Sequence, residues 1–262
     1  MPDQQPEEPS LAEAAILLRL KPADLIRILA QARPLPVARI PTRDAAAAIA
    51  DGLRGLGIES VIISNDDLFL ETSAIRIRAL ECSDDLLTAV ATVGRAQISI
   101  GWNEVTLLVA GRLLSNRVEV EERSRHGRKQ TVDSRQLTAD ESVLDIYSKT
   151  GAMNWRIVAG GFDFSCLGSA KGVTTLQNFA ALVSFLLDRA PAAGFDDSYN
   201  RARPVLEALW PVEQQIRQNQ LRRRGSGKFN SATITTTDNE GQFSRYSRLR
   251  YCLRLRELEH GR

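Results

Sequence analysis

The amino-acid sequence predicts an α+β protein, and three observations lead to that class. Apolar residues recur at helical spacing in some segments and at every second position in others, so one chain contains both helix and strand patterns. The strand patterns come in groups instead of alternating with helices, which is typical of α+β proteins. The chain has 262 residues, 43% of them hydrophobic and 25% charged, which is the composition of a folded protein with room for two domains.

Residues 1–34 are expected to form an N-terminal tail and two short helices. The first ten residues are acidic and rich in proline, unlike the basic start of a signal peptide. Apolar residues at helical spacing then predict helices over Leu11–Leu20 and Ala23–Ala32, which Pro22 separates. We expect these helices to be an appendage of a larger domain.

Residues 35–102 are expected to form a first domain with the element order β-α-β-β-α-β. Thr42 is placed to cap a helix that Gly57 ends, and a second, shorter helix is expected from Ser83. This order is that of the split βαβ, ferredoxin-like arrangement, in which two helices cover one face of an antiparallel sheet. The four strands are expected at Val37–Ile40, Ile58–Ile63, Ile75–Ala79 and Gln97–Trp102.

One stretch of this segment carries a family resemblance. The residues PLPVARIPTRDAAAAIADGLRGLGIESVIISNDD, from Pro34 to Asp67, combine a strand, an alanine-rich helix, a GLGIE turn and a second strand. This pattern resembles small bacterial ferredoxin-like domains assigned to signal transduction, and more loosely the SPOR and ACT-like domains. The resemblance implies a binding or regulatory role. ACT-like kinship would imply a site for a small regulatory molecule, but no ligand motif matches residue by residue.

Residues 103–191 are expected to form a second domain, a curved β-sheet closed by one helix. Thr174 and Gln177 have the spacing of a capping box before an apolar stripe that ends at Pro191. A run of strands closed by one amphipathic helix is similar in topology to the pleckstrin-homology-like superfold, which implies a binding or assembly module. No lipid-phosphate motif of that fold is present. The six strands are expected at Val105–Ala110, Arg117–Glu122, Lys129–Val132, Val143–Ser148, Asn154–Ala159 and Phe162–Leu167.

Residues 192–262 are expected to form a broken helix and a basic β-hairpin. The helical pattern over Tyr199–Leu221 contains two prolines, which should start or kink the helix. A loop follows, and Ala232–Thr236 alternates like a strand. After a turn, arginine and apolar residues alternate over 248–256, which predicts the second strand of the hairpin.

Positive charge is concentrated in the same region. Residues 214–262 hold eleven Lys and Arg against four Asp and Glu, although the whole chain has a net charge of only +2. In the predicted strand, alternate arginines would share one face at a spacing of about 6.6 Å, which suits phosphate contacts. The same series is also expected of a solvated or acid-paired face that protects an edge strand. The candidate polyanion-binding residues, which aromatic residues interrupt, are Arg222, Arg223, Arg224, Lys228, Arg245, Arg248, Arg250, Arg254 and Arg256.

No motif indicates catalysis, a cofactor or a metal. The GSGK at Gly225–Lys228 lacks the spacing of a phosphate loop, and the glycines of 159–172 lack the dinucleotide-binding order. Cys166 has no histidine held beside it, because His126 lies in a charged run and His260 close to residue 262, so we expect a small core residue. Three acidic pairs are expected to cap helices and turns: Asp66-Asp67, Asp84-Asp85 and Asp196-Asp197.

We therefore expect a non-catalytic cytoplasmic module that binds or regulates another protein. Three dispersed cysteines and two histidines argue against a disulfide framework or a zinc site and fit a reducing compartment. No apolar run approaches the roughly 20 residues of a membrane helix. A homo-oligomer formed through an open sheet face or edge is a further expectation. Two alternatives stay open, namely binding of nucleic acid or another polyanion through the basic hairpin, and an enzyme of unrecognised type.

Overall fold

The computed structural model describes residues 8–31, 33–68, 74–91, 97–125, 128–149, 154–222 and 229–260. This part of the chain contains both helices and a large β-sheet, which confirms the α+β class. The chain divides into two compact units, residues 1–70 with 201–211 and residues 71–200 with 212–262. These boundaries differ from the four consecutive segments expected from the sequence.

The first unit is built around the helices α1 (Glu8–Leu18), α2 (Pro22–Leu29) and α3 (Arg43–Gly55). Buried leucines and alanines of these three helices form a common core. The Thr42 hydroxyl accepts a hydrogen bond from an N–H of the first turn of α3, and Gly57 follows that helix with a φ of +76°. Such a φ is in the left-handed region that glycine tolerates best. The two N-terminal helices and the capped third helix are therefore confirmed.

The expected β-α-β-β-α-β order of residues 35–102 is wrong. Val37–Ile40 and Ile58–Ile63 contain no strand, and Ile58 is buried in the helical core of the first unit. The residues after Ser83 form a strand instead of a helix. The Ser83 N–H donates to the Leu86 carbonyl at 3.0 Å and the Leu86 N–H donates to the Ser83 hydroxyl at 3.0 Å, which closes a tight turn. The Asp84-Asp85 pair thus lies in a hairpin turn between two strands of the other unit.

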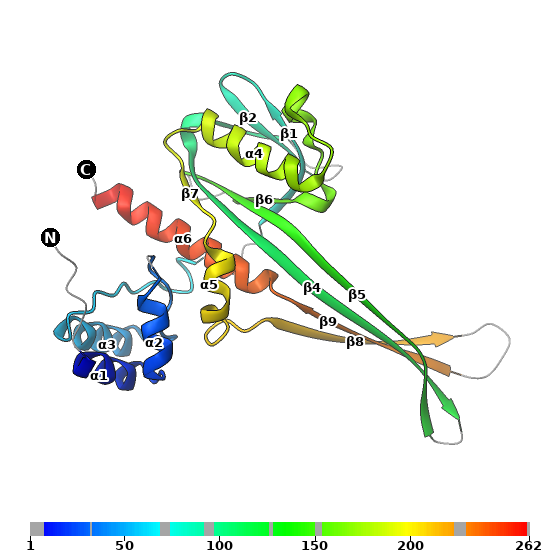
Figure 1. Cartoon of the computed structure of the whole chain (residues 1–262), viewed down its shortest axis with the longest axis horizontal. Coiled ribbons are helices and arrows are strands. Elements are labelled where there is room, and N and C mark those ends of the chain that lie inside the picture. Colours follow the sequence, from blue (N-terminus) through cyan, green and yellow to red (C-terminus); the bar gives the residue numbers. More distant parts are fainter. Residues whose placement is uncertain are drawn as a thin grey trace. The chain divides into compact units, whose positions relative to one another are not determined.

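The second unit contains one sheet of nine strands among the described residues (Figure 1). Its strand order is β3-β2-β1-β6-β5-β4-β9-β8, with the short β7 parallel to β4. The strands are β1 (Ile75–Cys82), β2 (Leu86–Ala91), β3 (Ile98–Gly101), β4 (Val105–Arg125), β5 (Arg128–Ser148), β6 (Asn154–Val158), β7 (Gly194–Asp196), β8 (Glu213–Arg222) and β9 (Phe229–Asp238). The helices are α4 (Thr175–Arg189) and α6 (Glu240–His260), with the 3-10 turns η1 (Trp102–Glu104), η2 (Ala159–Gly161) and η3 (Phe164–Ala170); α5 (Tyr199–Leu206) spans the boundary between the units.

The sheet has one helix on each of its two faces. Leu144 and Ile146 of β5 belong to the same hydrophobic core as Leu182 of α4. The intervening Tyr147 stacks instead on Tyr251 of α6, with ring centroids 4.5 Å apart. Since successive side chains of a strand point to opposite faces, α4 and α6 cover opposite sides of the sheet.

Of the pleckstrin-homology-like segment expected at 103–191, the closing helix is present but the separate curved sheet is not. The capping box of α4 is present, because the Gln177 N–H donates to the Thr174 hydroxyl and the Thr174 N–H to the Gln177 side chain, both at 3.2 Å. Four of the six expected strands, however, are halves of the long strands β4 and β5. Phe162–Leu167 mostly belongs to η3, which begins where the Asp163 carboxylate accepts from the Ser165 N–H. The strands β1–β3 join the same sheet, so this segment does not form a sheet of its own.

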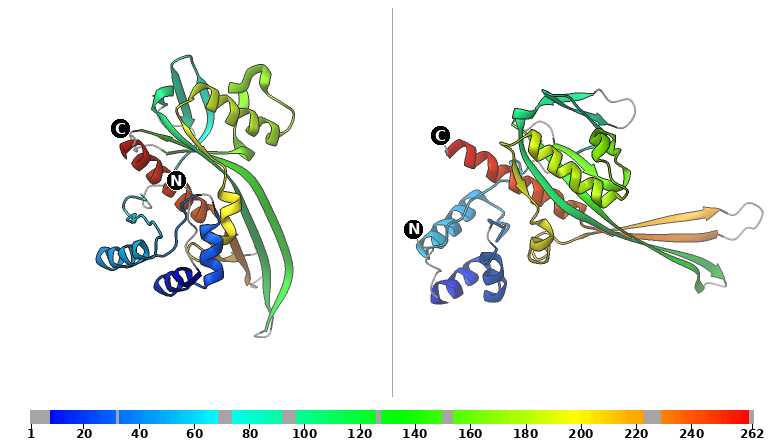
Figure 2. Two further views of the ribbon diagram at one scale, coloured as in Figure 1. Left: turned by 60° about the vertical axis from the view of Figure 1, so that its left-hand side comes forward. Right: turned by 45° about the horizontal axis from the view of Figure 1, so that its top comes forward.

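A four-stranded arm extends from the body of the sheet. We define it as residues 112–125 of β4, residues 128–142 of β5, and the strands β8 and β9. β6 pairs with β5 only as far as Val143. Among the described residues, β5 therefore has no strand beside it within the arm except β4. Figure 2 shows β4 and β5 curving as they leave the body of this unit. Side chains from Asp133 to Asp140 are exposed, so the arm is a solvated sheet.

The C-terminal region also differs from its prediction. The expected broken helix over 199–221 is the short α5 followed by the strand β8. The first hairpin strand is confirmed as β9, but its partners are β8 and β4. Residues 248–256, predicted as the second strand, lie in α6. Phe243, Tyr246 and Tyr251 are buried, and burial of aromatic residues three to five positions apart favours a helix packed on the sheet.

Candidate nucleic-acid interface

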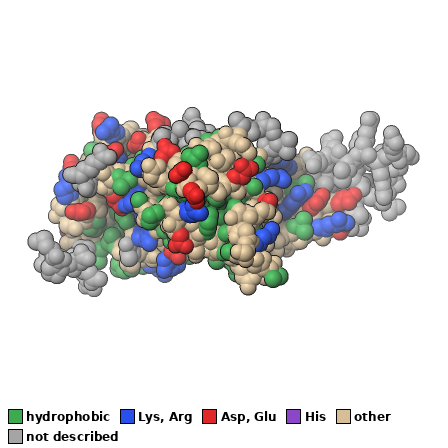
Figure 3. Space-filling view, turned by 90° about the horizontal axis from the view of Figure 1, so that it is seen from above, with side chains coloured by type: hydrophobic (Ala, Val, Ile, Leu, Met, Phe, Trp, Pro, Cys, Tyr) green, Lys and Arg blue, Asp and Glu red, His purple; other side chains and the backbone are tan. Residues whose placement is uncertain are grey.

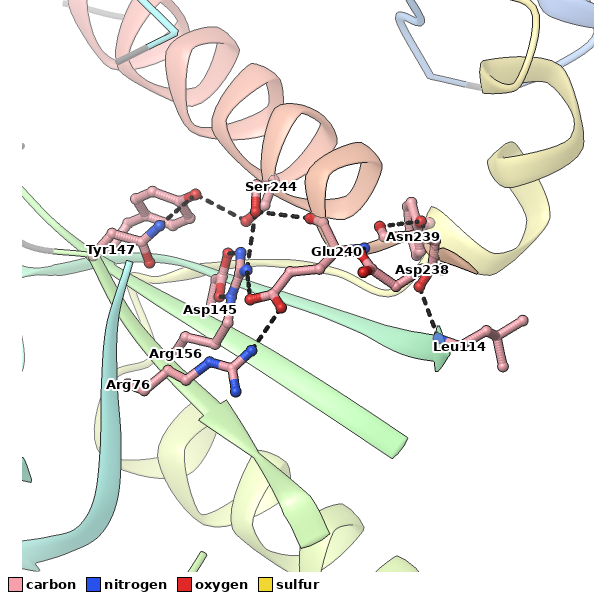
Figure 4. A network of polar contacts seen from close by, with 12 residues as sticks. Arg76, Leu114, Asp145, Tyr147, Arg156, Asp238, Asn239, Glu240 and Ser244 are labelled. Atoms are coloured by element: carbon pink, nitrogen blue, oxygen red, sulfur yellow. Dashed lines mark hydrogen bonds and ion pairs between the residues drawn. The ribbon is translucent and has the colours of Figure 1, made fainter. Parts of the chain in front are cut away.

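A buried polar network attaches α6 to the sheet (Figure 4). Arg156 of β6 donates from Nε and Nη2 to the two carboxylate oxygens of Asp145 on β5, each at 2.7 Å. These side chains are 3% and 0% exposed. Arg156 Nη1 also donates to Glu240 at 3.1 Å and to the Ser244 hydroxyl at 2.9 Å, both on α6. Bidentate pairing between arginine and a carboxylate offsets much of the free energy lost when both charges are removed from water.

Glu240, the first residue of α6, joins this network to the protein surface. Its second carboxylate oxygen accepts from Arg76 Nη2 of β1 at 2.6 Å. Burial alone would raise the pKa of Glu240, but the hydrogen bond and charge of Arg76, together with Arg156, outweigh it and lower that pKa. The negative charge also lies at the positive end of the α6 dipole. Glu240 therefore stabilises the start of the helix and its contact with two strands.

Tyr147 continues the contact along the helix. Its hydroxyl is 2.9 Å from the Ser247 hydroxyl and accepts from Asn154 Nδ2 at 3.1 Å. Burial, followed by the nearby Asp145 charge, raises the pKa of Tyr147. The Tyr251 hydroxyl donates to a backbone carbonyl of β5 at 2.8 Å. The tyrosine hydroxyls are hydrogen-bonded across the interface between α6 and the sheet, so these contacts hold the helix in place.

The arginines of α6 are largely committed to contacts inside the second unit. Arg245 pairs with Glu213 at 3.3 Å, and Arg254 pairs with Glu257 at 3.2 Å. Arg248 is buried and Arg256 is half-buried. Because these residues lie in a helix, they do not form the one-sided series expected of a strand. Both strand-face interpretations of this series therefore lose their geometric basis, although Arg245 and Arg254 do pair with acids.

Arg250 is paired with a second buried acid, Asp196. Its Nε lies 2.7 Å from Asp196 Oδ2, and the side chains are 13% and 1% exposed. The other oxygen of Asp196 accepts from the Ser198 N–H at 2.8 Å, the Ser198 hydroxyl at 2.7 Å and the Tyr246 hydroxyl at 3.0 Å. Burial acts to raise the pKa of Asp196, but these hydrogen bonds and the Arg250 charge lower it. Asp196 thus has the structural role that was expected of the acidic pairs.

The register of the arm brings two basic stretches, far apart in the sequence, to the same end of the sheet. Arg125 is opposite Arg128 in the β4–β5 pair, and Arg123 of β4 is opposite Asn230 of β9. Arg222 of β8 is opposite Phe229, the neighbour of Asn230. Four adjacent strands span about 15 Å, since neighbouring strands lie about 4.8 Å apart. We call these five positions the basic end of the arm: Arg123, Arg125, Arg128, Lys129 and Arg222.

Only Arg222 of this set was a candidate from the sequence. The candidates Arg223, Arg224 and Lys228 lie outside the described residues. The other four members were missed because strand register joins segments about 100 positions apart, and no local pattern reports it. A usable signal was present, since both RSRHGRK and RRRGSGK combine several cations with glycine between two strand patterns. Each is typical of a basic hairpin end.

The rest of the arm carries the opposite balance of charge. Outside 122–130 and 219–232 it has four arginines and seven acidic residues. Arg112 pairs with Asp140 at 2.8 Å and Arg135 with Asp133 at 3.2 Å. Figure 3 shows Lys and Arg side chains lying among Asp and Glu side chains over the described part of the visible surface. The excess of positive charge is therefore confined to one end of the arm.

The remaining candidate residues of the described ranges do not form a metal cluster. No group of three or more His, Cys, Asp or Glu in this part of the chain could hold a metal ion. His126 lies outside the described residues. In the Asp66-Asp67 pair, Asp67 accepts from the Ser64 N–H at 3.1 Å in a turn. None of the helices in the described ranges has the length and apolar character to cross a membrane.

Comparisons with known proteins add no assignment to this geometry. Searches with the whole chain found no matching protein-family model, no matching curated protein and no matching solved structure. The functional argument therefore depends on the arm itself.

Proposed function

We propose that the protein is a non-catalytic binding module that holds nucleic acid by its phosphodiester backbone at the basic end of the arm. The observation that supports this proposal is the strand register, which collects Arg123, Arg125, Arg128, Lys129 and Arg222 at one end of four paired strands. Glu122 is the one acidic residue among the strand positions 122–125, 128–130, 219–222 and 229–232. Such a cluster attracts phosphates irrespective of base sequence.

The shape and charge of the arm support a nucleic-acid partner. The four paired strands together are about 15 Å across, wider than the major groove of a duplex at about 12 Å, so the end of the arm is expected to lie against the phosphate backbone instead of entering the groove. The acidic balance of the rest of the arm disfavours phosphate contacts away from its end. Binding is therefore expected to involve the tips of both hairpins and to show little sequence preference.

The salt dependence of binding tests this proposal. The full chain is titrated with a 20-base-pair DNA duplex, and with one of its strands alone, over a series of salt concentrations. Each phosphate contact with a duplex contributes about 0.9 to the slope of log K against log salt. The variant Arg125→Gln with Arg128→Gln removes the opposed pair at the hairpin end. We expect its slope to be smaller by about 1.8.

A matched variant controls for the loss of positive charge in general. Arg117→Gln with Arg135→Gln removes two arginines from the same two strands, where they pair with Glu119 and Asp133. We expect this variant to keep the slope of the parent. An equal loss in both variants would show that net charge, and not the basic end, controls binding. If the chain binds neither probe at low salt, the proposal is wrong and another protein becomes the partner to test.

A further inference from the structure

Two of the three cysteines meet in the second unit, at a place that the proposed function does not use. Cys82 is the last residue of β1, and Cys166 lies in η3. A parallel β-bridge between Ala79 and Asp163 joins β1 to the start of η3. In it, the Asp163 N–H donates to the Arg78 carbonyl at 2.6 Å. Both cysteines pack against the main hydrophobic core and both are only half-buried. Each thiol also shifts the pKa of the other, as expected of two neighbouring sulfur groups.

The surroundings give the two sulfur atoms different roles. The hydrogen bond from Cys82 lowers the pKa of Cys166, because it stabilises the Cys166 thiolate. The same hydrogen bond, followed by burial, raises the pKa of Cys82. The cation Lys171 also favours the Cys166 thiolate, although the Asp163 carboxylate opposes it. Cys166 is therefore the better nucleophile and Cys82 the proton-bearing partner.

We propose that Cys82 and Cys166 close a reversible intramolecular disulfide by exchange with a low-molecular-weight disulfide of the glutathione class. The Cys166 thiolate attacks one sulfur of the small disulfide, whose S–S bond breaks and releases one small thiolate. Cys82 then loses its proton to solvent, and its sulfur attacks the Cys166 sulfur of the mixed disulfide and releases the second small thiolate. Two electrons pass from the cysteine pair to the small disulfide, and two small thiols result.

Closure would join the end of β1 to η3 and restrict the unfolded chain. A crosslink between residues so far apart in the sequence removes much of the entropy of the unfolded state. We expect the oxidised protein to melt about 5–10 °C above the reduced protein. The third cysteine, Cys252, is buried in α6, and Cys252→Ser supplies a matched control.

The test treats the full chain with oxidised glutathione, alkylates the remaining thiols after denaturation and measures the intact mass. The parent is expected to carry one alkyl group, on Cys252, and Cys252→Ser none. Apart from that group, both should be lighter than the reduced protein by the mass of two hydrogens and should be free of glutathione. Cys82→Ser is expected to stop at a glutathione adduct on Cys166, whereas Cys166→Ser should react much more slowly. Three free thiols in the treated parent, equal adducts in the two single variants, or a disulfide between chains would overturn the proposal. None of these outcomes depends on nucleic-acid binding.

Discussion

Gly111 of β4 lies directly under the ring of Phe243 in α6. A Cβ atom at position 111 would be 2.6 Å from Phe243 Cε2 and 2.9 Å from Cδ1 of Tyr199. Real Cβ atoms do not approach ring carbons so closely, so the helix sits on the sheet at a distance that glycine alone permits. We predict that Gly111→Ala lowers the free energy of unfolding by about 1–3 kcal/mol, because two aromatic rings must shift. Urea unfolding measures this loss.

Gly161 provides the comparison for this substitution. No atom lies within 4 Å of a Cβ built there, and its φ is not in the left-handed region. Gly161→Ala should therefore change the free energy of unfolding by less than about 1 kcal/mol. Equal stability of the two variants would mean that α6 moves away from β4 without cost.

Removal of Arg156 is predicted to be far more costly than removal of an exposed arginine. Arg156→Met leaves the fully buried Asp145 carboxylate without its two charged hydrogen bonds. We expect a loss of about 3–5 kcal/mol, against less than about 1 kcal/mol for the exposed Arg117→Met. The double variant Asp145→Leu with Arg156→Met should be more stable than Arg156→Met alone, because it removes the unpaired charge. Thermal or urea unfolding of the three variants checks the order.

Stability is predicted to fall in acid through Glu240 and Asp196. Both have a pKa below the ordinary values of 4.5 and 3.8. A carboxylate whose folded pKa is lowered adds stability that is complete above its unfolded pKa and is lost as the pH falls through the folded value. The free energy of unfolding should therefore decrease below about pH 4.5. Glu240→Gln should show a shallower decrease than Glu259→Gln, which changes an exposed acid of the same helix. Parallel curves for the two variants would contradict this assignment.

The helices were predictable where local chemistry determines them. Thr42 and Gly57 delimit α3, and Thr174 with Gln177 starts α4, because capping bonds join residues three or four positions apart. The α6 prediction failed because alternating arginine and leucine also places leucines four positions apart, as at 249 and 253. The helix is favoured because it buries one of its faces against β5 and β6, and those strands lie far from residues 248–256 in the sequence.

The sheet and the candidate site depended on contacts that no local pattern contains. The stretch Ile58–Ile63 has the composition of a strand, but Ile58 is buried against helices and has no partner strand there. The basic end joins Arg123 to Arg222 through register across β9. Charge counting along the chain grouped Arg222 with the arginines of α6, because it measures proximity in sequence and not in space.

The last prediction separates the arginines of α6 from those of the basic end. Arg250→Gln takes the charged partner from Asp196, which is 1% exposed, so we expect a loss of about 2–4 kcal/mol in the free energy of unfolding. Arg245→Gln breaks a more exposed pair with Glu213 and should cost less than about 1 kcal/mol. Because these side chains already contact acids of the same unit, neither change should alter the salt slope of duplex binding by more than a few tenths. The measurement is a salt series with each folded variant beside Arg125→Gln with Arg128→Gln. A slope reduced by about 0.9 in Arg245→Gln would move the nucleic-acid contact from the end of the arm to the helix.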